Sequence, residues 1–400
     1  MEAQKRRGGF GPGMLVAAAF VGPGTVTTAT LAGQTFGMAL LWALVFATLA
    51  AVVLQDMAAR LGAGGGRGLG EALRLSLRTP MLRYTALALV SIAILLGNAA
   101  YQGGNLAGAA LGAEATGVTI GRRLVVVLIA VLAASVLLPG RYRLLEGVLV
   151  GIVALMSAAF LLALALARPD PAALFAGLRP QLPEGSLLTV LALLGTTIVP
   201  YNLFLHAAAA KERWPGGGSV PAARRDNVAA ILLGGLVSAA ILIVAASSGN
   251  GEGQTGLADA LRESFGGLSR YVMAAGLLAA GLSSAVTAPM AAGFVAGELF
   301  ASSEAERVRY FRLASLTVLL TGTVIAALGL RPEALILLAQ AANGLLLPVV
   351  AVFLLALMNR SDLLGSHRNR LWSNIAGGLV VLTALFLGLR GLLRAFGLWP

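Results

Sequence analysis

The sequence has 400 residues, of which 58% are hydrophobic and only 12% are charged. A soluble domain carries about 25% charged residues, so this composition excludes a cytosolic enzyme and predicts an integral membrane protein. The net charge of +12 is therefore no sign of a nucleic-acid partner, and the lack of cysteine excludes disulfides, thiolate metal sites and thiol catalysis.

Apolar runs bounded by charged residues or glycine predict about eleven membrane-spanning helices of roughly 20 residues each. The expected spans are 11–33, 38–60, 82–110, 122–139, 144–167, 184–210, 226–248, 269–298, 309–330, 333–358 and 372–396. These spans use most of the chain and leave no room for a large soluble domain. We therefore expect a single transmembrane domain over residues 1–400.

Lysine and arginine are unequally distributed between the expected loops. Twenty of the 29 fall in the segments that are cytoplasmic when the N-terminus is inside. Because positively charged loops stay in the cytoplasm, we expect a cytoplasmic N-terminus and a C-terminus on the opposite side. We expect a monomer in a bacterial inner membrane, whose anionic lipid accounts for the positive charge. The tryptophans near expected interfaces are typical of an aromatic belt: Trp42, Trp214, Trp372 and Trp399.

Two expected spans contain helix breakers at mid-depth. In the first span, Gly22, Pro23 and Gly24 remove one amide donor and two Cβ atoms, and in the sixth span Pro200 lies deep inside the apolar run. Breaks in spans one and six predict two five-helix halves followed by an extra helix, the pattern of an inverted-repeat transporter. The alternative is a pair of ordinary proline kinks, whose freed backbone groups are satisfied by neighbouring helices.

At these residues the chain resembles the NRAMP family of divalent-metal transporters. The resemblance rests on GPGMLVAAAFVGPGT in the first span, LLWALVFATLAAVVLQDMAARLG in the second, VPYNLFLH in the sixth, AGLSSAVTAPMAAGF in the eighth and AQAANGLLLP in the tenth. It implies an all-α membrane fold of the LeuT-like inverted-repeat type, with broken helices one and six. The two repeats are expected at about 11–167 and 184–358, with the extra helix at 372–396. The implied activity is proton-driven import of a divalent metal by alternating access.

The chain departs from the family at its metal-binding motifs. The family's Asp-Pro-Gly-Asn is represented by Gly22 and Thr25 at the acid and amide positions, and its Met-Pro-His by Val199, Pro200 and Tyr201. Gln340 is the one position whose side chain matches a family metal ligand. The substrate site implied by the resemblance comprises the backbone carbonyls of Ala19 and Thr196 with Gly22, Thr25, Val199, Tyr201, Asn202 and Gln340.

Groups for proton coupling are also sparse. Asn98 and Tyr101 stand where the family carries an aspartate and a glutamate in its third span, and with Asn105 they either line a polar path or bond between helices. Every acidic residue falls in a loop or near a span end. His206 is the only titratable histidine at depth, and two readings stay open for it: proton coupling, or hydrogen bonding to a neighbouring helix.

A neutral site constrains the substrate. A buried dication needs compensating charge, and half-helix N-termini aimed at the break favour an anion. We therefore expect a secondary transporter whose family substrate is a divalent metal but whose selectivity is atypical. The alternatives are a transporter of a small neutral, anionic or zwitterionic solute, and a membrane sensor that does not transport. No enzymatic activity and no cofactor are expected, because no nucleophile with a base, carboxylate pair or metal cluster is evident.

Overall fold

A computed structural model of the chain describes residues 12, 21–77, 79–117, 120–137, 142–214, 219–247, 261–262 and 265–395. These residues form helices and connections, with no strand among them. The elements are α2 (Pro23–Phe36), η1 (Gly37–Leu40), α3 (Leu41–Gly65), α4 (Leu69–Ser76), α5 (Pro80–Ala115), α6 (Arg122–Leu137), α7 (Tyr142–Ala167), α8 (Pro171–Gly177), α9 (Leu187–Thr197), α10 (Pro200–Arg213), α11 (Val220–Ser247), α13 (Leu268–Phe300), α14 (Glu304–Ala327), α15 (Pro332–Leu357), α16 (Ser361–Leu364), η2 (Gly365–His367) and α17 (Leu371–Ala395).

Eight helical stretches of the described chain are long and apolar enough to cross a membrane. The stretch Pro23–Gly65 contains part of the expected span 11–33 and all of 38–60, and Gly151–Ala167 is a shorter apolar helix. Each expected span from the second onward overlaps a helix, with ends that differ by a few residues. The number of crossings and the grouping into 11–167, 184–358 and 372–396 stay predictions.

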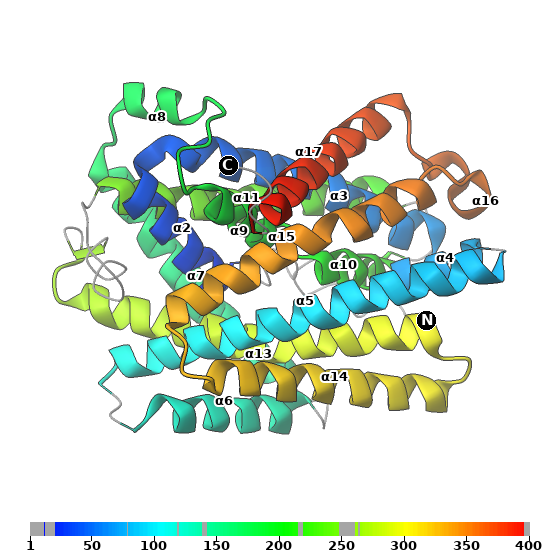
Figure 1. Cartoon of the computed structure of the whole chain (residues 1–400), viewed down its shortest axis with the longest axis horizontal. Coiled ribbons are helices and arrows are strands. Elements are labelled where there is room, and N and C mark those ends of the chain that lie inside the picture. Colours follow the sequence, from blue (N-terminus) through cyan, green and yellow to red (C-terminus); the bar gives the residue numbers. More distant parts are fainter. Residues whose placement is uncertain are drawn as a thin grey trace.

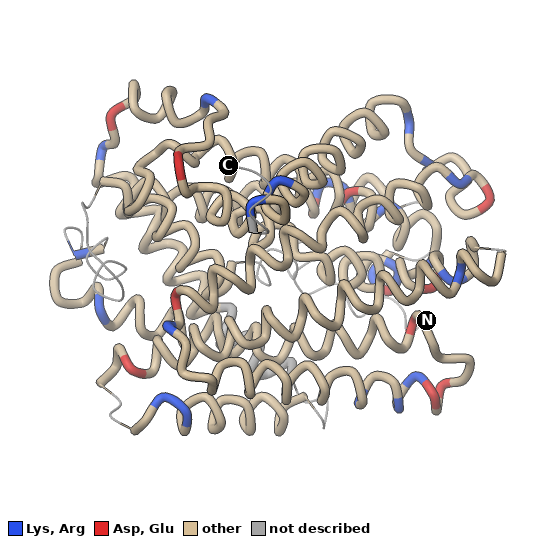
Figure 2. Tube along the Cα trace, viewed as in Figure 1, with Lys and Arg blue, Asp and Glu red and all other residues tan. Residues whose placement is uncertain are grey.

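The long helices pack along much of their length. Helix α13 lies between α5 and α14, and α15 packs against α5 and α9, as Figure 1 shows. Helix α11 contacts α2 and α3 on the other side of the molecule. Charged residues lie mainly at helix ends and in connections, and the long middle stretches carry few (Figure 2). This arrangement keeps ionised groups out of the apolar interior, where they are costly.

The sixth span is interrupted rather than kinked. Helix α9 ends at Thr197, and α10 begins at Pro200. Between them Ile198 has φ −116° and ψ 75°, and Val199 is extended at φ −74° and ψ 123°. Proline disfavours the helical conformation in the residue before it, and two β-branched residues precede Pro200. The expected break is therefore confirmed, and the kink alternative is wrong here.

Proline alone does not produce such a break. Helices α13 and α15 contain the internal residues Pro289 and Pro348 and continue through them. Alanine precedes Pro289 and leucine precedes Pro348, so neither follows a β-branched pair. The carbonyl that Pro289 leaves without its amide donor is that of Ala285, four residues earlier, and it accepts a hydrogen bond from Nε2 of Gln102 of α5, at 3.0 Å. A neighbouring helix thus compensates for the proline there.

In the first span a helix begins at the expected break. Helix α2 begins at Pro23, and its N-cap Gly22 is extended at φ −113° and ψ −171°. Pro23 suits this position, since the first helical residue needs no amide donor. Before residue 21 only Pro12 is described, so Ala19 lies outside the described residues.

Helices α9 and α15 approach so closely that only glycine fits at their contact. A Cβ atom at Gly195 would lie 1.8 Å from the backbone oxygen of Gln340, and one at Gly344 would lie 2.3 Å from the backbone oxygen of Leu191. Small residues commonly allow membrane helices to approach in this way. The contact holds α15 directly against the half-helix that ends at the break.

This contact yields a stability prediction. Gly195→Ala should lower the free energy of unfolding by about 1–3 kcal/mol, because the added methyl group must separate two backbones. Gly378→Ala is the matched control, since a Cβ atom there meets nothing within 4 Å. It should leave stability unchanged or raise it by up to about 1 kcal/mol. Unfolding in detergent micelles measures both, and equal effects of the two variants would contradict the prediction.

Candidate substrate site

The two helix breaks meet through a direct hydrogen bond. The Oγ1 atoms of Thr25 and Thr196 lie 2.8 Å apart, and both side chains are fully buried. Thr25 belongs to the first turn of α2, and Thr196 to the last turn of α9. The bond therefore ties the beginning of one half-helix to the end of another.

Helix α15 closes the site with Gln340. A Cβ atom at Gly24 would lie 2.2 Å from Nε2 of Gln340, so this side chain rests on the glycine backbone in the first turn of α2. Both polar atoms of the Gln340 amide are buried and have no hydrogen-bond partner among the described residues. Buried amides almost always have a partner. A water molecule or a substrate is therefore expected against Gln340.

Helix α10 contributes a second amide of the same kind. Asn202 is fully buried, and neither its Oδ1 nor its Nδ2 has a partner among the described residues. The preceding Tyr201 packs edge-on against Tyr101 of α5, with ring centroids 5.7 Å apart. Val199, at the break itself, is fully buried and offers no polar side-chain atom. The side chains gathered around the breaks are thus polar but neutral.

The polar residues of α5 divide into two groups. Asn98 donates to the backbone oxygen of Ala288 at 3.2 Å, and Gln102 donates to that of Ala285 at 3.0 Å, so both join α5 to α13. Asn105 is buried, and its amide lacks a partner among the described residues. Of the two readings left open by the sequence, interhelical bonding describes the contact that Asn98 makes. Gln102 was not singled out from the sequence.

His206 contacts a neutral amide. Its Nδ1 lies 2.9 Å from Oε1 of Gln55, which joins α10 to α3. An amide oxygen only accepts, so Nδ1 carries the hydrogen. Nε2 is buried without a partner in the described part of the chain. The sequence offered no sign of the Gln55 partner, which lies 151 residues away.

Acidic residues are remote from the breaks along the helices that build the site. Helices α2 and α9 contain none, α10 has only Glu212 in its last turn, and α15 has only Glu333 in its first. At 1.5 Å per residue, Glu212 is about 15 Å from Asn202 along α10, and Glu333 about 10 Å from Gln340 along α15. Among the described residues, no group of three or more His, Cys, Asp or Glu side chains is able to hold a metal ion.

The charges instead form ion pairs near helix ends, several of them at one end of the bundle. Asp56 accepts from Arg60 at 2.9 Å and from Arg224 at 2.7 Å, while Lys211 of α10 donates to Glu71 of α4 at 2.8 Å. Burial raises the pKa of the Glu71 carboxyl, but the hydrogen bond and charge of Lys211 outweigh burial and hold this pKa below its usual value. These contacts fasten the outer end of α10 to α4.

A protein-family comparison matches most of the chain. The family described as "Natural resistance-associated macrophage protein-like" (Nramp) matches residues 13–394. A curated relative, the divalent metal cation transporter MntH of Chromohalobacter salexigens, is 32% identical over 213 residues, which are 51% of this chain and 47% of that protein. The chain thus spans about half the length of the curated relatives that it matches.

Solved structures share the fold. A crystal structure of the Eremococcus coleocola manganese transporter has a TM-score of 0.74 at 24% identity, covering 95% of this chain and 85% of that one. Mhp1, a nucleobase-cation-symport-1 family transporter, has a TM-score of 0.57 at 15% identity, covering 98% and 94%. The expected fold is confirmed: an all-α membrane protein of the LeuT-like inverted-repeat type.

The bond between the breaks leads to a second prediction. Thr25→Val and Thr196→Val preserve side-chain shape but remove a hydroxyl, and each should cost about 1 kcal/mol of stability by leaving its partner less well bonded. The double variant should cost less than the sum, with a coupling of about 0.5 kcal/mol or more. A double-mutant cycle on unfolding in detergent measures this coupling, and strict additivity would rule out the bond.

Proposed function

The chain belongs to the Nramp family, and from this membership we propose that it is a secondary transporter that carries a divalent metal cation by alternating access. The observation that carries the proposal is the neutral polar site where the breaks of α2 and α9–α10 meet under Gln340. Broken helices of this kind bind the substrate in transporters with inverted repeats. The relatives named as divalent metal cation and manganese transporters support the choice of cargo. We propose no enzymatic activity.

The ligand set suggests how the metal is held. Thr25, Thr196, Asn202 and Gln340 supply neutral oxygens, which are hard ligands. Since no carboxylate lies near the breaks on these helices, neutral oxygens alone do not offset the cost of stripping a dication of its water. We therefore propose that the ion keeps part of its hydration shell. The N-termini of α2 and α10 at the breaks disfavour a bare cation, whereas the C-terminus of α9 at the same place favours one.

Selectivity should be weak for the same reason. A thioether or thiolate ligand selects soft and borderline metals, and Val199 offers neither. We propose that the site discriminates little between manganese and magnesium. A small neutral, anionic or zwitterionic solute is the other occupant that the uncharged site suits, but the names of the relatives favour the metal.

The arrangement in the membrane is also a proposal. The basic residues at the ends of α3, α4 and α10 and at the beginning of α11 lie with their ion pairs at one end of the bundle. Because basic loops stay inside, we propose that this end is cytoplasmic and that the C-terminus faces the other side of a bacterial inner membrane. We further propose a monomer that contacts membrane lipid.

His206 is proposed to pack α10 against α3 rather than to couple protons. This proposal is supported by the hydrogen bond of His206 to the Gln55 amide, which is neutral, whereas a carboxylate partner would stabilise a protonated imidazole. His206→Gln should accordingly leave the pH profile of uptake unchanged in proteoliposomes, because the titrating group would lie elsewhere. A shift of the profile by a unit or more would assign the coupling role to His206. Asn98 and Tyr101 remain proposed members of the polar pathway.

Transport itself is tested with purified protein in proteoliposomes. Saturable uptake of manganese and magnesium, with counterflow, is the expected result. Saturable uptake of a zwitterionic amino acid without metal uptake would show that the substrate is the alternative solute and not a metal. The absence of counterflow for every solute would favour the sensor reading.

The missing countercharge provides a sharper test. Gly22→Asp should tighten divalent-metal binding by about tenfold or more, because a buried carboxylate supplies a charge that the site lacks. Gly22 is extended, a conformation that any residue adopts. Gly22→Asn is the matched neutral control and should change binding much less. Equal effects of Asp and Asn on metal affinity, measured by titration calorimetry, would refute the electrostatic account.

A further inference from the structure

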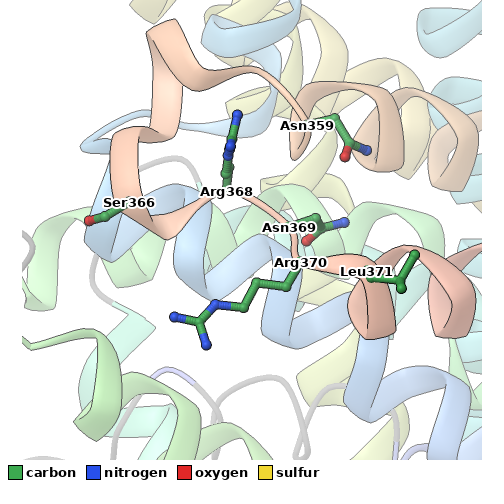
Figure 3. A pocket seen from close by; sticks show the side chains of 6 residues that line it. All are labelled: Asn359, Ser366, Arg368, Asn369, Arg370 and Leu371. Atoms are coloured by element: carbon green, nitrogen blue, oxygen red, sulfur yellow. The ribbon is translucent and has the colours of Figure 1, made fainter.

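A polar pocket of about 460 Å³ lies far from the helix breaks, where α15, η2 and α17 meet. We call it the α15–α17 pocket, and Figure 3 shows the side chains that line it. They are Asn359, Ser366, Arg368, Asn369, Arg370 and Leu371. Two of the six are arginines and none is acidic, so the pocket favours an anion.

The pocket has a rigid amide framework. Asn359, in the turn after α15, and Asn374 of α17 donate to each other at 3.0 and 2.6 Å, and Asn369 donates to Asn374 at 2.8 Å. Asn369 in turn accepts from the buried Arg60 of α3 at 2.7 Å. Arg60 also donates to the backbone oxygen of His367 at 2.9 Å. The turn before α17 is therefore fastened to both α15 and α3.

The two arginines that line the pocket stay outside this framework. Arg368 and Arg370 are exposed, and neither forms an ion pair with another described residue. The nearest acid along the chain, Asp362, is already paired with Arg360 at 2.7 Å. Figure 3 shows that the two side chains extend in different directions from the turn, so one guanidinium group can contact a bound phosphate while the other adds to the positive charge around the pocket.

The surface next to the pocket indicates the level of the bilayer. Leu371 and Trp372, at the beginning of α17, are 71% and 78% exposed, and Ile375 and Leu379 continue an exposed apolar face along the helix. In a membrane span such a face contacts lipid tails, and an exposed tryptophan at its end marks the interface. The arginines that immediately precede this face therefore lie at the level of lipid headgroups.

We propose that the α15–α17 pocket binds the phosphate headgroup of an anionic phospholipid. Arg368 and Arg370 attract the headgroup through their positive charge, and the acyl chains lie along the apolar face of α17. A soluble phosphate compound shares the headgroup chemistry but makes no use of this apolar face. The proposal does not depend on which solute the central site transports.

The test compares lipid binding by two double variants in detergent. Native mass spectrometry with phosphatidylglycerol should show that R368Q/R370Q binds this lipid about tenfold or more weakly than the unaltered chain, because each basic side chain near the headgroups adds to the attraction. R309Q/R312Q is the matched control. It removes the same charge from exposed arginines of α14, at the end proposed as cytoplasmic, and should bind as the unaltered chain does.

Further measurements separate the lipid from other sources. Zwitterionic phosphatidylcholine should bind more weakly than phosphatidylglycerol and be insensitive to R368Q/R370Q, and millimolar glycerol phosphate should not displace bound phosphatidylglycerol. Equal weakening by R309Q/R312Q would assign the effect to overall charge and overturn the proposal. Displacement by glycerol phosphate would overturn the lipid in favour of a soluble ligand. Unchanged binding by R368Q/R370Q would exclude the pocket altogether.

Discussion

Every backbone group freed at a helix break inside an apolar bundle must find a partner within the protein, and this requirement governs the structure. At Ile198 and Val199 the chain leaves helical geometry between α9 and α10. The break persists because other helices lie directly against it. Helix α15 contacts α9 with no Cβ at Gly195, and α2 contributes the Thr25 hydroxyl. The substrate site is therefore a product of helix packing as much as of its own side chains.

The same low-dielectric interior accounts for the distribution of charge. Ionised side chains such as Asp56 and Lys211 form pairs at the outer ends of helices, where water stabilises them in addition to their partners. Around the breaks the polar groups are hydroxyls and amides, of which Asn202 and Gln340 have unfilled hydrogen-bonding capacity. A cation that enters such a site finds no opposite charge to offset the cost of its desolvation. Retaining part of its own water shell is the simplest way to lower that cost.

Local sequence was sufficient where local conformation decides the structure. Hydropathy predicted the spans, and a proline deep inside the sixth span, paired with Gly22, Pro23 and Gly24 in the first, predicted the break at Pro200. Pro289 and Pro348 show the limit of that reasoning, since α13 and α15 continue through them. The hydrogen-bond partners of the buried polar side chains could not be predicted from the sequence, because residues such as Gln55 and His206 are 151 positions apart. No periodicity encodes which distant helix will face a buried amide.

One rule connects the centre of the protein with its edge. Neutral amides occur in both places: Asn202 and Gln340 are buried near the breaks, and Asn359, Asn369 and Asn374 form a hydrogen-bonded frame around the beginning of α17. The difference is the distance from water. Arg60 is buried in this frame because Asp56 and Asn369 bond to it, whereas Arg368 and Arg370 are exposed outside the frame, at the level proposed for lipid phosphates. The exclusion of charge that makes the central site neutral thus also makes the rim of the protein attractive to anionic lipid.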